Sequence, residues 1–318
     1  MNRFVANLCI IVLAMIVFLP MTVQAQTIPT FMMSWSATPM PDGMDIDQSG
    51  QVLVITEDGT IRAFTGNGAL IRTLSGLYPN CVGVSADNAG NVFVADLWAH
   101  CIHKLTADGT PIMTWGTLGS GQYQFNHPYN ARYSRYNNQL YVSDQFNGRI
   151  VRYTTEGVYI GEWGSVGTAP GQFNICSGIG IDPRNGRVVV MENNSTNVVR
   201  GQVFTPDGAF LFQFGSGGTG DGQFNHPLNA AVGPDGTIYV ADKDNHRVQM
   251  FTEAGIYVGQ FGSRGTGDGQ FRECYAVGVD SDGNVFASDH TGGRIEKFSS
   301  IATDVHATTW GKLKSLYR

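Results

Sequence analysis

The chain has 318 residues, of which 41 are Gly and only 14% are Asp, Glu, Lys or Arg. Because Gly disfavours a helix by about 1 kcal/mol relative to Ala and few charged side chains are available for exposed helix faces, this composition excludes a helical bundle, a coiled coil and a charge-rich disordered chain, and leaves a turn-rich all-β protein. The net charge of −6 excludes the basic surface that nucleic acid requires, so we expect no nucleic-acid partner.

The first 25 residues have the pattern of a secretory signal peptide. Arg3 precedes the apolar run 8–19, and Val23 and Ala25 occupy the −3 and −1 positions of a cleavage site. An uncleaved membrane anchor is the alternative. No later segment reaches the roughly 18 apolar residues of a membrane span. The sequence therefore predicts a secreted or periplasmic protein, without a transmembrane segment after the signal peptide is removed.

A strand-like segment then recurs every 40 to 50 residues, from QVLVIT at 51–56 to NVFASD at 284–289. Each copy is rich in Val, Ile and aromatic residues and follows a turn that contains Gly. In each unit a second strand follows, a third ends on an aromatic residue, and a short strand of small residues precedes the segment. Six units of four strands at this period predict a β-propeller.

The sixth unit lacks its last strand, and the missing strand is predicted at the other end of the domain. The segment from Phe31 to Trp35 is similar to IMTWG and IGEWG, which end other units, whereas no such pattern follows Phe298. A closed ring leaves no exposed inner sheet edge. We therefore expect an all-β, six-bladed β-propeller of four-stranded antiparallel blades over residues 26–300, closed by its N-terminal strand.

Two stretches carry a family resemblance, GTGDGQFNHPLNAAVGPDGTIYVADKDNHRVQMF at 218–251 and GTGDGQFRECYAVGVDSDGNVFASDHTGGRIEKF at 265–298. Their pattern resembles the NHL-repeat family of six-bladed propellers, and four of the six units match it well. Unit 1 has Thr56 in place of the repeat Asp, and unit 4 has Glu192 for Asp and Asn197 for Arg. The resemblance implies a rigid scaffold, whose relatives include ubiquitin-ligase subunits, receptor-kinase ectodomains and a peptide-amidating lyase.

The amidating lyase of that family holds a metal through His residues that follow the Pro at the start of each inner strand. In this chain none of those positions is His; they are Asp42, Val82, Tyr129, Ser177, Leu228 and Tyr275. His127 and His226 precede the Pro instead, within FNHP, and two His residues from two blades do not form a catalytic zinc site. We therefore predict no metal and no cofactor, and FNHP loops that cap blade junctions.

Cys and Pro alternate around the predicted ring at the Pro position that starts each inner strand. Cys81, Cys176 and Cys274 occupy it in units 2, 4 and 6, which places three thiols at the channel entrance with His127 and His226. Alternate blades hold these thiols beyond the ~7 Å Cα separation of a disulfide. The favoured interpretation is three small buried residues in a Pro-sized slot. A Cys81–Cys101 disulfide and an isolated metal trap are the alternatives.

An Asp and an Arg lie five residues apart across one hairpin in three units, at Asp144 and Arg149, Asp242 and Arg247, and Asp289 and Arg294. Catalysis needs an asymmetric constellation, whereas these pairs repeat around the ring. The repetition therefore predicts structural ion pairs that fix each hairpin.

Aromatic and His residues gather in loops that propellers place on one face; they are Trp98, His100, Tyr129, Phe146, His246, Tyr275 and His290. Such side chains on a rigid scaffold predict a surface that binds a peptide, protein or glycan without catalysis. The alternatives are scattered surface residues, a lyase-like or hydrolase-like enzyme with its site at the channel mouth, and a subunit of a cell-envelope assembly.

The tail 301–318 differs from the repeats. Apolar residues recur at helical spacing at Trp310, Leu313, Leu316 and Tyr317, with basic residues between them. The pattern predicts a short amphipathic helix that contacts an envelope partner through 302–318, and a frayed tail is the alternative.

Overall fold

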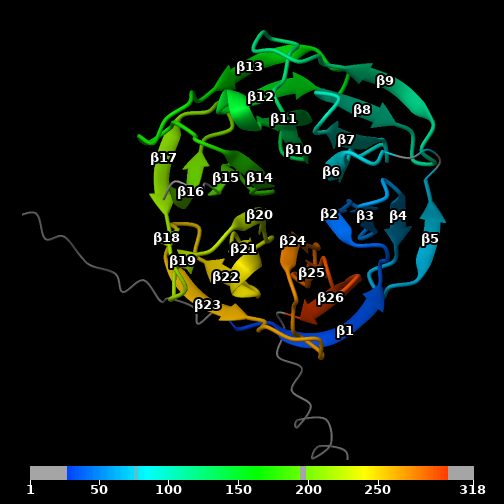
Figure 1. Ribbon diagram of the computed structural model, residues 1–318, viewed down its shortest axis with the longest axis vertical. Coiled ribbons are helices and arrows are strands. Elements are labelled where there is room, and N and C mark those ends of the chain that lie inside the picture. Colours follow the sequence, from blue (N-terminus) through cyan, green and yellow to red (C-terminus); the bar gives the residue numbers. More distant parts are fainter. Residues whose placement is uncertain (1–26, 75, 77, 194–197, 300–318) are drawn as a thin grey trace, which may run out of the picture.

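The computed structural model describes residues 27–74, 76, 78–193 and 198–299. Six four-stranded antiparallel sheets are arranged around a central axis, as Figure 1 shows. In five sheets the first strand lies nearest the axis and the last strand lies at the rim, and in the sixth β24 lies nearest the axis and β1 lies at the rim (Figure 1). This arrangement confirms the predicted six-bladed β-propeller. The predicted signal peptide, the tail 301–318 and Asn197 lie outside the described residues.

The blades follow one another along the chain. Blade 1 contains β2 (Pro41–Ile46), β3 (Val52–Thr56), β4 (Ile61–Phe64) and β5 (Leu70–Thr73). Blade 2 contains β6 (Cys81–Ala86), β7 (Val92–Asp96), β8 (Cys101–Leu105) and β9 (Pro111–Trp115). Blade 3 contains β10 (Pro128–Ser134), β11 (Gln139–Asp144), the short helix η1 (Gln145–Asn147), β12 (Arg149–Thr154) and β13 (Tyr159–Trp163).

The second half of the ring repeats this order. Blade 4 contains β14 (Cys176–Ile181), β15 (Val188–Asn193), β16 (Val199–Phe204) and β17 (Phe210–Phe214). The parallel pair β18 (Ser216–Gly217) and β19 (Gln223–Phe224) leads to blade 5, which contains β20 (Pro227–Val232), β21 (Ile238–Asp242), η2 (Lys243–Asn245), β22 (Arg247–Phe251) and β23 (Tyr257–Phe261). Blade 6 contains β24 (Cys274–Val279), β25 (Val285–Asp289) and β26 (Arg294–Ser299).

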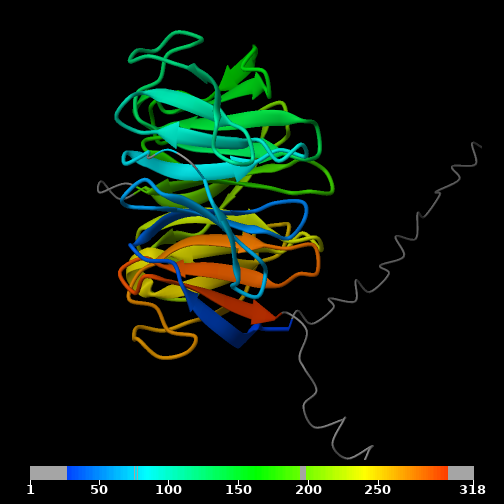
Figure 2. The same ribbon diagram turned by 90° about the vertical axis from the view of Figure 1, so that its right-hand side faces the viewer.

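Blade 6 is completed by the N-terminal strand β1 (Thr30–Ser36), which pairs antiparallel with β26. Trp35 lies opposite Ile295 in this pair, and its ring centroid lies 6.2 Å from Phe64 of blade 1. The predicted closure of the ring by the segment from Phe31 to Trp35 is therefore confirmed. Figure 2 shows the closed disc from the side.

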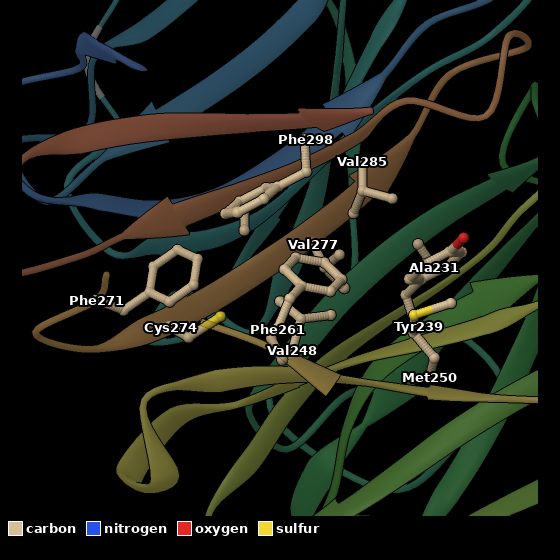
Figure 3. Close-up of a cluster of buried hydrophobic side chains, with 12 residues drawn as sticks. Ala231, Tyr239, Val248, Met250, Phe261, Phe271, Cys274, Val277, Val285 and Phe298 are labelled. Atoms are coloured by element: carbon tan, nitrogen blue, oxygen red, sulfur yellow. The ribbon is translucent and has the colours of Figure 1, made fainter. Parts of the chain in front are cut away.

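The core lies between the faces of neighbouring blades. Figure 3 shows the layer between blades 5 and 6, where Val248 and Phe261 face Val277 and Phe298. The ring centroids of Phe261 and Phe298 are 4.5 Å apart. Full burial of each such side chain contributes roughly 1.5 to 3 kcal/mol. The aromatic residue that ends the outer strand of blade 5 is thus an interblade contact.

The inner strands approach one another closely because small residues line them. A Cβ atom added at Gly43 would lie 2.0 Å from the Val82 carbonyl oxygen of the next blade, and one added at Gly178 would lie 2.5 Å from the Cα of Asn229. Neither position accepts a side chain without movement of the backbone. The Gly residues of the short preceding strands therefore set the width of the channel.

The repeated Asp–Arg ion pairs are present. Arg149 Nε lies 2.8 Å from Asp144 Oδ2, and its guanidinium also donates to the carbonyls of Gly121 and Gln124 in the loop that leads into the blade. The predicted structural role is confirmed. In blade 4 the Arg position is Arg200, whose Nε lies 2.6 Å from Glu192. The prediction that Asn197 replaces the Arg was wrong, because a longer hairpin shifts the register so that Arg200 faces Glu192.

No helix within the described part of the chain has the length and apolar character needed to cross a membrane.

Candidate binding face around the channel mouth

One face of the disc carries two sets of loops, and we call it the loop face. The loops between the second and third strands of each blade meet the loops that lead into the inner strands, as in the bonds from Phe146 N to Asn126 O (3.0 Å) and from His290 N to Glu273 O (2.9 Å). The opposite face, which we call the turn face, carries the remaining turns. The structure places all seven predicted binding residues at the loop face, where most of them fall into two groups.

The first group, which we call the aromatic group, comprises Trp98, His100, His127 and Phe146. The ring centroid of His127 lies 4.8 Å from Trp98, 4.9 Å from His100 and 4.6 Å from Phe146. Trp98 is 64% exposed and Phe146 is 46% exposed. Burial lowers the pKa of His127, and the neighbouring His100 lowers it further. The group is therefore an aromatic surface between blades 2 and 3.

The second group, which we call the mouth cluster, surrounds His290 in blade 6. His290 Nε2 lies 3.0 Å from Asp42 Oδ1 and its Nδ1 lies 3.1 Å from Glu273 Oε2. The Tyr275 ring stacks on the imidazole with centroids 4.3 Å apart. Burial lowers the pKa of His290, but the hydrogen bonds to the two carboxylates outweigh burial and raise it. The His290 imidazole thus joins blade 6 to blade 1 through its contact with Asp42.

A β-bulge directs residues of the mouth cluster toward the channel. The register of the inner strand shifts between Pro41 and Gly43 in blade 1 and between Pro128 and Asn130 in blade 3. Such a shift re-aims the extra residue, here Asp42 and Tyr129. Burial raises the pKa of the Tyr129 hydroxyl, and the nearby Tyr275 and Asp42 raise it further. Side chains from blades 1, 3 and 6 therefore meet across the channel mouth.

His246 lies apart from both groups. Its Nδ1 lies 2.7 Å from the Arg272 carbonyl oxygen. It lines an open groove of about 680 Å³ between blades 5 and 6. The other lining residues are mostly charged or polar and include Asp244, Arg264, Arg272 and Glu273. Because Glu273 also contacts His290, this charged groove continues into the mouth cluster.

The thiols predicted at the channel entrance take a different position. Cys81, Cys176 and Cys274 each open an inner strand at the loop face, but all three side chains are buried among interblade hydrophobic residues. Figure 3 shows Cys274 beside Phe261 and Phe271. The thiols do not line the channel, because the first residue of each inner strand faces the neighbouring blade. Cys176 Sγ, for example, lies 3.6 Å from the Arg149 carbonyl oxygen of blade 3.

The structure also places His226 and the two thiols of the alternative disulfide. His226 lies at the surface, where its Nδ1 is 2.9 Å from Asp244. Both His127 and His226 adopt a left-handed backbone, with φ of 59° and 64°. Cys81 and Cys101 are free thiols. Both pair with Asp96 from opposite sides of β7, so their Cα atoms are roughly 10 Å apart, too far for the alternative disulfide.

A further cavity, of about 170 Å³, opens at the turn face, where sequence analysis predicted no site. Arg132, Arg135 and Asp45 line it together with apolar residues from the ends of the inner strands. Arg132 lies 2.7 Å from Asp45, and Arg135 donates to the Ile46 carbonyl. The segment ARYSR has two Arg residues where other inner strands have small or acidic residues, and that contrast is the sequence feature that marks this cavity.

A comparison with known protein families identifies one repeat in this chain. The sequence profile of the NHL repeat matches residues 224–251, which include the first three strands of blade 5. The chain is thus a six-bladed β-propeller that contains an NHL repeat. A search of curated protein sequences found no significant match.

Solved structures with the same architecture have diverse roles. A gluconolactonase from Xanthomonas campestris aligns with a TM-score of 0.63 and 12% identity, over 85% of this chain and 94% of that chain. Virginiamycin B lyase from Staphylococcus aureus aligns with a TM-score of 0.58 and 15% identity, over 86% of this chain and 100% of that chain. The WD40 propeller domain of Doa1 aligns with a TM-score of 0.55 and 13% identity, over 82% and 79%. At these identities the similarity shows the fold alone.

Proposed function

We propose that the protein is an exported propeller that binds a peptide, protein or glycan through its loop face, without catalysis. Among these ligand classes, we propose a polypeptide segment. The aromatic group supports this proposal most strongly. Trp98 and Phe146 are exposed on either side of His127. Exposed aromatic side chains of this kind mark interaction surfaces, and Trp is among the residues that contribute most to protein binding.

The charges of the loop face suit the same ligand. Lys243 Nζ lies 3.2 Å from Glu273, and Arg264 and Arg272 line the groove beside them. A surface with both signs of charge next to an aromatic patch fits a polypeptide, whose side chains and backbone offer charged, apolar and hydrogen-bonding groups together. The binding surface we propose therefore extends from the aromatic group across the channel mouth to this groove.

The mouth cluster also supports a binding role rather than a catalytic one. A general base must present a free ring nitrogen to the proton that it removes. Both nitrogens of His290 are held by carboxylates, Asp42 on one side and Glu273 on the other. In this arrangement His290 joins two blades and positions Tyr275, with which it stacks.

A test of the binding proposal uses a phage-displayed random peptide library and a glycan array on the purified protein. We expect peptides to be enriched, and we expect Trp98→Ala with Phe146→Ala to weaken the selected peptides by roughly tenfold or more. Ile256→Ala is the matched control, because Ile256 is 65% exposed in a turn after β22 at the turn face. Glycan binding without peptide binding, or peptides that bind the double variant equally well, would contradict the proposal.

A second candidate function is an enzyme at the channel mouth. Its support is the approach of Tyr129 and Tyr275, whose pKa values are raised by burial. Ionisable groups with perturbed pKa values at a protein cleft often carry acid–base chemistry. The gluconolactonase similarity suggests a lactone panel as the substrate test. Lactone hydrolysis that is lost in Tyr129→Phe but kept in Trp98→Ala would favour the enzyme over the binding protein.

The exported location rests on residues 1–25. Amino-terminal sequencing of the protein after expression in a bacterial host with a periplasm tests it. We expect the mature chain to begin at Gln26, and a retained leader would favour the membrane anchor instead. Capture of an envelope partner by the full chain, but not by a chain that ends at residue 301, would support the assembly alternative.

A further inference from the structure

Blade 2 differs from blades 3 to 6 in two of the four side chains at one set of aligned positions, which we call the hairpin row. The row comprises the first residue of the inner strand, the last residue of the second strand, and the first and third residues of the third strand. In blade 5 these residues are Pro227, Asp242, Arg247 and Gln249. In blade 2 they are Cys81, Asp96, Cys101 and His103.

Blade 2 therefore keeps the buried carboxylate of the row but not its Arg. Arg149, Arg200, Arg247 and Arg294 lie beside the carboxylates of blades 3 to 6. Asp96 is only 8% exposed, and Cys101 lies opposite it where those blades have Arg. A buried carboxylate needs a cation or several hydrogen bonds to offset its loss of hydration. Asp96 Oδ1 accepts the backbone N–H groups of Trp98 at 3.1 Å and Ala99 at 2.8 Å. A cation in place of the guanidinium would therefore act on Oδ2, which faces His103 Nε2.

The side-chain atoms around Asp96 that could bind a metal ion lie close together. Residues directly opposite one another on adjacent strands project from the same side of a sheet, so Cys81 and Cys101 lie on either side of Asp96. His103 lies two residues beyond Cys101 and therefore points to the same side. One ligand atom each from Cys81, Asp96 and His103 lie within 4.8 Å of one another. Cys101 Sγ lies 3.6 Å from His103 Nε2.

The orientation of His103 is that of a metal ligand. Its Nδ1 lies 2.9 Å from the Thr114 hydroxyl, and the Tyr78 ring lies 5.2 Å from the imidazole. These contacts direct Nε2 toward the sulfur and carboxylate atoms. A fixed second nitrogen is the usual arrangement for a metal-bound His. In a nucleophilic triad the acid and the thiol contact different ring nitrogens, whereas Asp96 and Cys101 both approach Nε2, each at 3.6 Å.

The separations suit a tetrahedral ion of small radius. Zinc binds sulfur, nitrogen and oxygen at about 2.0 to 2.3 Å, which places neighbouring ligand atoms roughly 3.3 to 3.8 Å apart. His103 Nε2 lies 3.6 Å from both Asp96 Oδ2 and Cys101 Sγ, and the group of Cys81, Asp96 and His103 atoms needs only small rotations of side chains to contract from 4.8 Å. His103 has 19% of its side chain exposed, so the site has a path from solvent.

We propose that Cys81, Asp96, Cys101 and His103 form a zinc-binding site in blade 2, in which the metal ion takes the structural place of the repeat Arg. The mixed sulfur, nitrogen and oxygen donor set selects zinc over calcium or magnesium, which prefer oxygen alone. This inference is independent of the loop-face ligand, and it replaces the prediction that the chain has no metal site.

The competing arrangement is a protonated His103 as the only cation. Hydrogen bonds to Asp96 and Cys101 raise the pKa of His103 to about 9. In that case an Asp96–His103 ion pair would neutralise the buried carboxylate. At neutral pH the protonated imidazole would then have no free lone pair with which to bind zinc. The two arrangements differ in metal content and in the response to a substitution at Cys101.

The test uses the full chain without an affinity tag, first depleted of metal with a chelator and then titrated with zinc or cobalt(II). We expect one equivalent to bind, with the near-ultraviolet charge-transfer band of cobalt bound to thiolate and a higher melting temperature. Cys101→Ser and His103→Gln should each weaken binding at least tenfold. Cys101→Arg is the decisive variant, because it restores the Asp–Arg pair of the other blades and should fold without metal.

The matched control is His226→Gln, which alters an exposed imidazole that lies outside the row and should leave the metal titration unchanged. Failure of the wild-type chain to bind cobalt with a thiolate band would overturn the proposal. So would a folded Cys101→Arg protein that binds zinc as tightly as the wild type.

Discussion

Blades 2 and 5 have the same strand register but stabilise their buried carboxylates differently. In blade 5 the Arg247 guanidinium lies 2.9 Å from Asp242 and also donates to the carbonyls of Gly220 and Gln223. In blade 2 thiols and an imidazole surround Asp96 instead. A buried carboxylate of the hairpin row can thus be stabilised in different ways, by a guanidinium in blade 5 and, in our proposal, by a metal ion in blade 2.

Blade 6 adds a third version of the row. Its residues at the last two positions are Arg294 and Glu296, where blade 5 has Arg247 and Gln249. In blade 5 Gln249 donates to Asp242 at 3.0 Å. In blade 6 Glu296 instead places a second carboxylate 2.8 Å from the Arg294 guanidinium, which already contacts Asp289. Blade 6 thus has one cation for two buried acids, and blade 2 has one acid without an Arg.

The largest effect is expected from Arg247→Ala. This change leaves Asp242, which is fully buried, without its cation and releases the loop carbonyls that Arg247 holds. Removing one partner of a buried pair costs about 3 to 5 kcal/mol. Urea denaturation should therefore show a loss of that size in the free energy of unfolding. A loss below about 1 kcal/mol, the level of an exposed ion pair, would show that the row does not depend on a cation.

An opposite and smaller effect is expected from Glu296→Gln, which gives blade 6 the Gln of blade 5. Burial raises the pKa of Glu296 to about 7, although Arg294 lowers it. The pKa of Glu296 is thus higher in the folded protein than in the unfolded chain. The neutral side chain therefore contributes fully to folding stability below about pH 4.5, and this contribution is lost as the pH rises through about 7.

The Glu296→Gln protein should therefore gain on the order of 2 kcal/mol over the wild type at pH 8 and little at pH 4. Chemical denaturation at both pH values measures this difference. A variant that is less stable than the wild type at pH 8 would contradict the raised pKa of Glu296.

A smaller effect is expected from Asp96→Asn in blade 2. Without metal, the change removes only a carboxylate at 3.6 Å from His103, so the free energy of unfolding should fall by about 1 kcal/mol. With zinc present the loss should be larger, because Asn is a poorer ligand. Melting curves with zinc and with chelator measure both values. Equal losses in the two conditions would argue against a metal in the row.

The smallest effect on stability is expected from Trp98→Ala in the loop beside the same row. Trp98 is 64% exposed, and surface substitutions of this kind change the free energy of unfolding by no more than about 0.5 kcal/mol. Ligand binding by the loop face should nevertheless weaken, which separates binding from folding in blade 2. A melting temperature that drops like that of Arg247→Ala would place Trp98 in the structural core instead.

Much of the fold was predictable because it repeats. A strand that follows a turn recurs six times and predicted the blades. The resemblance of Phe31–Trp35 to the other outer strands predicted the closure that the pairing of β1 with β26 confirms. The pairs such as Asp144 and Arg149 were predictable because their spacing repeats. Arg200 was missed because the hairpin of blade 4 is longer than the others.

The site chemistry was less predictable because it depends on side-chain direction. Cys81 and Cys101 were recognised as two thiols in one blade, but only strand register shows that Asp96 lies between them. The alternation of His103 with Cys101 in CIHKL is the one sequence feature that places both side chains on the same side of the strand. The bulge at the start of the inner strands turns Asp42 and Tyr129 toward the channel while Cys176 and Cys274 face the neighbouring blades, and sequence alternation alone does not locate a bulge.

The central claim is that blade 2 has exchanged the Arg of the hairpin row for a metal ion. The most direct test is a crystal of the protein grown with zinc, with diffraction measured on both sides of the zinc absorption edge. We predict an anomalous peak between Cys81 Sγ, the Asp96 carboxylate and His103 Nε2. A zinc-containing crystal that shows no peak there, and in which His103 is hydrogen-bonded to Asp96, would contradict the claim.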